Sequence, residues 1–160
     1  MYRKKALALW LMALLVVFSL AGCSLSHAGN KGIAVDKMTA DEHTAYSLAK
    51  GLYSGEQQKQ LEAVKEYCTP NLIKTLSQKI RLGKMTHRLH GVKVIVSVNK
   101  KDSKGAYTLV LVHLENHADQ AKQRILLLRE GKVSKIHSPK NKHYKKEDKA
   151  IKKQMRQATS

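Results

Sequence analysis

The spacing of apolar residues changes once along this chain, near Leu89. Before that point apolar side chains recur at the three- and four-residue intervals of an amphipathic helix. After it they alternate with polar ones, which is typical of a half-buried strand. Helices followed by strands, with no repeat of the pattern within 160 residues, predict a single α+β domain with an antiparallel sheet.

Three helices are expected in the first half of the chain. The first runs from about Thr39 to Tyr53, because Thr39 can cap its amino end. A second covers Glu56–Cys68, and Thr69-Pro70 then breaks the chain and restarts it. The apolar face of the third helix consists of Leu72, Ile73, Leu76 and Ile80.

Four strands are expected in the second half. The first starts at Gly91, and the second, over Tyr107–Leu114, is apolar on both faces and should therefore lie inside the sheet. The third covers Lys122–Arg129 and the fourth Val133–His137, with a hairpin turn between them at Glu130-Gly131. Further turns are expected over Asp102–Gly105 and Asn116–Asp119. One face of the first strand should carry Val92, Val94, Val96 and Val98.

The amino-terminal segment has the pattern of a secretion signal. Basic residues at positions 3 to 5 precede an uncharged run from Ala6 to Leu20. The run is about 15 residues long, shorter than the roughly 20 that span a bilayer as a permanent helix. We therefore expect the rest of the chain to be exported.

The signal ends in Leu20-Ala21-Gly22-Cys23, which resembles the lipobox of bacterial lipoproteins. The resemblance implies that Cys23 receives a diacylglyceryl thioether, that residues 1–22 are removed, and that the new amino terminus can be acylated. Two or three acyl chains hold a protein in a bilayer essentially permanently. We expect a lipid anchor in the cell membrane with the domain on its extracytoplasmic face. An ordinary signal peptide or an uncleaved anchor is the alternative, and it places the domain on the same side.

The mature chain divides into three parts. Residues 23–36 are small and polar, which predicts a flexible tether, and residues 37–137 contain the α+β domain. Residues 138–160 form a basic tail that is either disordered or partly helical. Its sizeable apolar side chains are Tyr144, Ile151 and Met155, so no apolar face wide enough to dock is expected.

The net charge of +18 predicts attraction to anionic partners. Outside the cytoplasmic membrane these are lipid headgroups and wall polymers, and a tail that is merely solvated is the alternative. Nucleic acid is disfavoured, because the one Phe and the one Trp lie in the signal and no stacking platform remains. The cations expected to face an anionic surface are Lys140, Lys142, Lys145, Lys146, Lys149, Lys152, Lys153 and Arg156.

Three segments, residues 45–55, 67–72 and 129–136, carry a resemblance to a known family. Through them, the stretch from Glu42 to Ile136 resembles the small domains called nuclear transport factor 2-like, especially their bacterial lipoprotein members. It implies a curved, cone-shaped sheet closed by helices. Related domains serve as binding modules, as parts of secretion and conjugation machines, and less often as isomerases or dehydratases.

A ligand pocket in such a cone would lie on one face of the sheet, although the same side chains are equally good core residues. Glu115 and His113 are the candidate acid and base there, with a polar strand end as the alternative. His pairs at 87/90 and 113/117 lack a completing ligand set, so neither a metal nor a cofactor is expected. The candidate pocket residues are Tyr107, Leu109, Leu111, His113, Glu115, Ile125 and Leu127.

Cys68 is the only cysteine besides Cys23, and its helical spacing with Leu61 and Val64 predicts a buried, inert thiol. Together these features predict a lipid-anchored, extracytoplasmic binding or assembly module that is not an enzyme. An isomerase-like enzyme and a component of an envelope-spanning secretion or conjugation machine, with an envelope protein as partner, are the alternatives.

Overall fold

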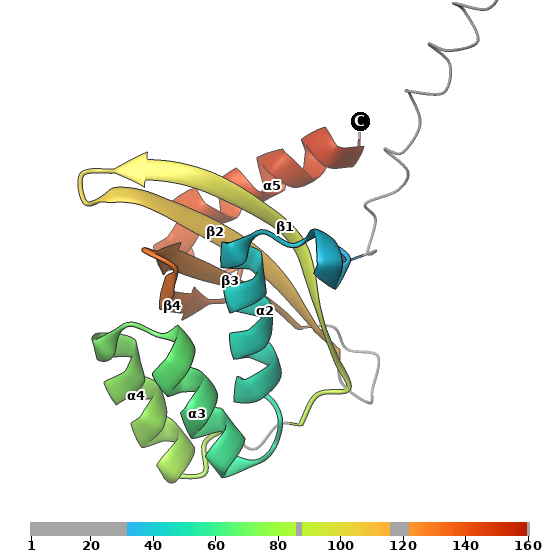
Figure 1. The fold of residues 1–160 in the computed structure, drawn as a ribbon. Coiled ribbons are helices and arrows are strands. Elements are labelled where there is room, and N and C mark those ends of the chain that lie inside the picture. Colours follow the sequence, from blue (N-terminus) through green and yellow to red (C-terminus); the bar gives the residue numbers. More distant parts are fainter. Residues whose placement is uncertain (1–31, 86–87, 116–121, 160) are drawn as a thin grey trace, which may run out of the picture.

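The computed structural model describes residues 32–85, 88–115 and 122–159, and it has an α+β fold (Figure 1). The first two helices and the last three strands begin and end within two residues of their predicted positions. Cys23 and the predicted turn over Asn116–Asp119 lie outside the described residues. The elements are η1 (Val35–Lys37), α2 (Ala40–Leu52), α3 (Gln57–Tyr67), α4 (Pro70–Arg81), β1 (Gly91–Asp102), β2 (Gly105–Glu115), β3 (Lys122–Arg129), β4 (Lys132–His137), η2 (Lys142–Tyr144) and α5 (Lys145–Thr159).

The four strands form one curved antiparallel sheet in the order β1-β2-β3-β4. The predicted internal position of β2 is confirmed. The predicted turn between β3 and β4 is also confirmed, because Glu130 and Gly131 both have positive φ angles, 51° and 71°. Positive φ at two successive positions matches the right-handed twist of the strands that a tight hairpin joins.

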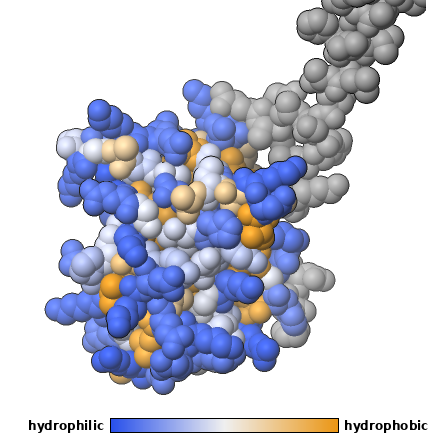
Figure 2. Space-filling view, in the orientation of Figure 1, coloured by the Kyte–Doolittle hydropathy of each residue, from blue (hydrophilic) through white to orange (hydrophobic). Residues whose placement is uncertain are grey.

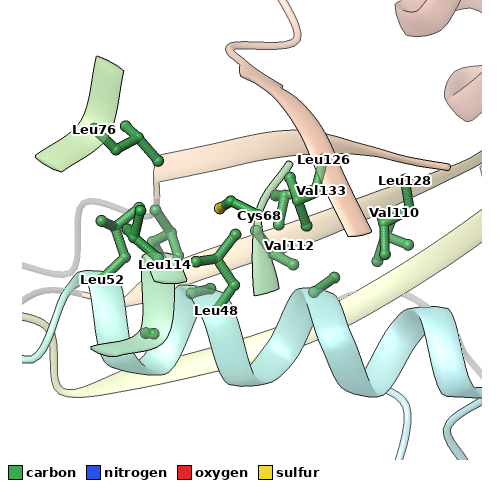
Figure 3. Close-up of a cluster of buried hydrophobic side chains, with 14 of the residues drawn as sticks. Leu48, Leu52, Cys68, Leu76, Val110, Val112, Leu114, Leu126, Leu128 and Val133 are labelled. Atoms are coloured by element: carbon green, nitrogen blue, oxygen red, sulfur yellow. The ribbon is translucent and has the colours of Figure 1, made fainter. Parts of the chain in front are cut away.

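The sheet is covered on both faces, as Figure 1 shows with α2 and α5 on opposite sides. Leu48 and Leu52 of α2 pack against one face, where α3 and α4 complete the larger cluster (Figure 3). Ile151 of α5 packs against the other face in a smaller cluster. The side chains that β2 contributes to the larger cluster are Val110, Val112 and Leu114, and those it contributes to the smaller one are Leu109 and Leu111.

A β-bulge at Ile95 changes which way β1 faces. Val94 pairs with Val112 whereas Val96 pairs with Leu111, so one extra residue lies between them. Because side chains alternate along a strand, one inserted residue reverses the faces that follow. Val92 and Val94 therefore face α2, and Val96 and Val98 face α5. The prediction that these four valines share one face is wrong.

The bulge brings the polar side chain of Ser97 toward α2, where it meets a buried carboxylate. Glu42 is 5% exposed, and its Oε1 accepts a hydrogen bond from Ser97 Oγ at 2.6 Å. Its Oε2 accepts one from the backbone N–H of Thr39 at 2.8 Å, while Thr39 Oγ1 accepts one from the Glu42 N–H at 3.3 Å. This capping box ties the start of α2 to β1.

The amino-terminal tether ends earlier than predicted. The backbone N–H of Ile33 donates to the carbonyl of Val94 at 2.7 Å, so the chain joins the sheet edge before residue 36. An edge strand has unpaired backbone groups, and a neighbouring segment can hydrogen-bond to them whatever its side chains are. A side-chain pattern therefore does not predict this contact. Gly32 permits the approach, since a Cβ there would lie 2.8 Å from the Cβ of Lys93.

Replacement of Glu42 by Ala should lower the free energy of unfolding by about 1–3 kcal/mol, because it removes the cap and leaves the Ser97 hydroxyl and the Thr39 N–H unpaired. Urea unfolding followed by circular dichroism measures this change. The matched control is Glu56→Ala at the start of α3, where the carboxylate makes only an exposed ion pair with Lys59. The control should change stability by less than about 0.5 kcal/mol, and equal effects of the two variants would contradict this role of Glu42.

Candidate functional site

Helix α5 is packed against the sheet rather than loosely attached. Ile151 is 2% exposed and lies in the cluster formed with Leu109, Leu111, Ile125 and Leu127. Ala150 and Met155 add partly buried contacts around it. The prediction that the tail has no apolar face wide enough to dock is therefore wrong. The sheet supplies most of the apolar surface of this interface, so the helix needs only a narrow stripe.

The connection from β4 to α5 is held by two stacked rings. His137 is 5% exposed, and its ring lies parallel to that of Tyr144, with centroids 3.9 Å apart and planes inclined by 14°. Within the described part of the chain, neither ring nitrogen has a hydrogen-bond partner. Burial lowers the pKa of His137, and Lys135 lowers it further, whereas Glu147 and Asp148 act in the opposite direction. The neutral imidazole is therefore the form that fits this site.

The side of α5 that faces away from the sheet is strongly basic. At about 100° per residue, its six cations fall within an arc of about 120° on the side away from Ile151. The two acidic residues, Glu147 and Asp148, fall within about 60° of Ile151 and are only partly exposed. In the first turn they also interact favourably with the helix dipole. The six cations, all exposed, are Lys145, Lys146, Lys149, Lys152, Lys153 and Arg156, which we call the α5 basic face.

The other predicted cations lie beside this face. Lys140 and Lys142 are exposed in the connection that leads into α5. Within α5, Lys152 makes an ion pair with Asp148 at 2.7 Å, one turn away. The packed helix therefore presents its cations at fixed spacings, which a disordered tail could not do.

The predicted sheet pocket is filled in this structure. Leu109, Leu111, Ile125 and Leu127 are each at most 5% exposed, and α5 lies over them. Tyr107, at the edge of this cluster, is half-buried, and the guanidinium of Arg129 lies 4.9 Å from the centre of its ring. These side chains thus serve as core residues, which was the alternative interpretation.

The candidate acid and base lie at the far end of β2, outside the packed cluster. Glu115 makes an ion pair with Lys93 at 2.5 Å, and the two side chains are 38% and 47% exposed. His113 lies on the same face of β2, two residues before Glu115, and is only partly exposed. Glu115 is thus a carboxylate in contact with water that is already paired with a lysine. The geometry favours a polar strand end.

The thiol of Cys68 is free and buried. Cys68 is 3% exposed, as predicted, and burial raises the pKa of its thiol to about 12, against the opposing effect of Lys132. The thiol is therefore protonated at neutral pH and is a poor nucleophile. Within residues 32–85, 88–115 and 122–159, no three His, Cys, Asp or Glu side chains lie close enough to hold a metal ion.

A cavity of about 410 Å³ lies at the carboxyl end of α2, where no site was predicted. Its lining comes from two segments, residues 46–54 and 88–92, which are separated by α3 and α4. Neither segment carries a recognisable binding motif. Only the fold brings them together.

The surface seen in Figure 2 is mostly hydrophilic, with small and separated apolar patches. None of the helices in the described ranges is long and apolar enough to cross a bilayer. Comparison of the chain with protein-family models, curated proteins and solved structures finds no match.

Stability should fall as the pH falls below about 6.5, the ordinary pKa of His, and part of this loss should come from His137. Because the pKa of His137 is lowered in the folded state, the unfolded chain takes up the proton first. This single group can reduce the free energy of unfolding by at most about 1.4 kcal/mol per pH unit. Denaturant unfolding at pH 7.5 and 5.0 measures the effect.

The comparison variant is His137→Phe, which keeps a ring against Tyr144 but cannot be protonated. It should lose less stability between the two pH values than the wild-type chain does. The same pH dependence in both proteins would show that protonation of His137 does not oppose the docking of α5.

Proposed function

We propose that this protein is a lipid-anchored, extracytoplasmic module of a bacterial cell envelope that binds an anionic surface through the α5 basic face and is not an enzyme. The lipobox-like Leu20-Ala21-Gly22-Cys23 supports the anchor. The observation that carries the surface-binding part is the separation of charge on α5, with the cations on its outer side and both acids near the sheet.

Electrostatic attraction of this kind depends on proximity. A Lys or Arg beside an anionic bilayer contributes about 1 kcal/mol, and the attraction decays over roughly 8 Å at physiological salt. A lipid on Cys23 would keep the domain close enough for this range to matter. Anionic lipid headgroups are then the first candidate partner, and phosphate-containing wall polymers are the second.

We further propose that the domain is nuclear transport factor 2-like, with α5 as an addition to it. Three helices followed by a curved four-stranded antiparallel meander support this proposal. An assembly role with another envelope protein, including a place in a secretion or conjugation machine, stays a prediction.

Neutralising the middle of the α5 basic face should weaken binding to anionic vesicles. In a protein of residues 24–160, the triple substitution Lys146→Gln, Lys149→Gln and Lys153→Gln removes about 3 kcal/mol, on the order of a hundredfold in affinity. Co-sedimentation with phosphatidylcholine vesicles that contain phosphatidylglycerol, at low salt, measures the loss.

The matched control removes three exposed cations from α3 and α4 by Lys65→Gln, Lys74→Gln and Lys79→Gln. This variant has the same net charge, and its affinity should stay within about threefold of the parent. An equal loss in both variants would mean that overall charge, and not the α5 basic face, determines binding.

The anchor is tested by Cys23→Ser. In bacteria, the wild-type chain should fractionate with membranes and give a mass that includes the diacylglyceryl group. The variant should move to a soluble or uncleaved precursor pool, because it has no thiol to modify. Membrane retention of the variant without precursor accumulation, or an unmodified Cys23 in the wild-type chain, would contradict lipid anchoring.

A further inference from the structure

The cavity at the carboxyl end of α2 has walls held by the fold. The backbone N–H of Leu89 donates to the carbonyl of Tyr53 at 3.1 Å, and that of His90 donates to the carbonyl of Glu115 at 2.9 Å. These bonds fix the segment before β1 between the end of α2 and the end of β2. The cavity volume of about 410 Å³ falls within the roughly 300–1,000 Å³ of small-molecule sites.

The inner wall of the cavity is apolar and aromatic. Tyr53, Leu89 and Val92 are each partly buried there and pack against the larger core cluster. Burial raises the pKa of Tyr53, while Arg124, which hydrogen-bonds to its side chain, lowers it. The phenol is thus protonated at neutral pH, and it sits beside a guanidinium. This wall suits the hydrocarbon part of a ligand.

The outer rim is cationic. Lys50 and Arg88 are exposed and line the cavity from opposite segments. The aliphatic part of the Arg88 side chain packs against Gly55. A Cβ added to Gly55 would come within 3.1 Å of the Arg88 Cβ. Lys50 lies 5.8 Å from the ring centre of Tyr46, which also lines the cavity. A guanidinium and an ammonium that line the same cavity favour a carboxylate or a phosphate there.

Among the described residues that line this cavity, none is acidic. Glu115 comes near it, because its Oε2 would lie 2.5 Å from a Cβ placed on Gly91, but its other oxygen is paired with Lys93. The charge of Glu115 is therefore balanced outside the cavity, and Lys50 and Arg88 keep their attraction for an anion.

We propose that this cavity binds a small amphiphilic anion. Its carboxylate or phosphate lies between Lys50 and Arg88, and its apolar body rests on Tyr53, Leu89 and Val92. The site is separate from the α5 basic face and does not depend on the proposed function. Either a lipid headgroup or a soluble metabolite could supply this chemistry.

The test is a titration of the full-length chain, held in a neutral detergent, with hexyl phosphate, followed by the amide NMR signals of Gly91 and Val92. The signals should shift with saturation. Inorganic phosphate, which lacks the apolar body, and hexan-1-ol, which lacks the charge, should each bind at least tenfold more weakly. Absence of saturable shifts, or equal binding of hexan-1-ol, would overturn the proposal.

The variant is Lys50→Gln with Arg88→Gln, and the matched control is Lys65→Gln with Lys74→Gln, which removes the same charge from exposed positions of α3 and α4. The first should bind hexyl phosphate at least tenfold more weakly, and the control should bind it unchanged. If the double variant melts at a lower temperature, Lys50→Gln alone should still show at least a threefold loss. Unchanged affinity in these variants would overturn the proposal.

The source of the anion is distinguished by competition with phosphatidylglycerol vesicles in the absence of detergent. Displacement of hexyl phosphate from Gly91 and Val92 identifies a lipid headgroup as the occupant, and persistence of the shifts identifies a soluble anion. Both results support the anionic site and differ only in the source of the anion.

Discussion

Both faces of β2 are apolar, and this single constraint requires a cover on each side of the sheet. Leu109 and Leu111 point to one side and Val110 and Val112 to the other, and each is at most 1% exposed. Exposure of one such side chain to water would forfeit about 1.5–3 kcal/mol. Helices α2 to α4 cover the face that carries Val110 and Val112, and α5 covers the face that carries Leu109 and Leu111. The last helix is therefore part of the domain.

The periodicity of the sequence predicted the helices, the strands and the internal position of β2, because these depend on local patterns. It could not predict the bulge at Ile95, since valines continue on both sides of the inserted residue. It also missed the docking of α5, because a stripe around Ile151 is too narrow to recognise without the sheet face that receives it. The cavity beside Lys50 and Arg88 was not predicted either, because segments that are far apart in the sequence form it.

Packing of α5 against the sheet fixes the directions in which its charged side chains point. A free basic tail would adapt to any anion, whereas a docked helix holds its acids near the sheet and turns its cations outward. The cavity at the end of α2 differs from this face, because Lys50 and Arg88 line it together with apolar and aromatic side chains. Under the two proposals, α5 binds an extended anionic surface and the cavity binds a small amphiphilic anion.

The docking of α5 is the claim on which this account depends most, and native-state hydrogen exchange at the amide of Ile151 tests it directly. If α5 is part of the cooperative domain, the opening free energy at Ile151 should approach that of Leu111 in β2, with which it shares a cluster. Exchange at the rate of an unstructured chain, while the amide of Leu111 stays protected, would show that the helix is a separate tail.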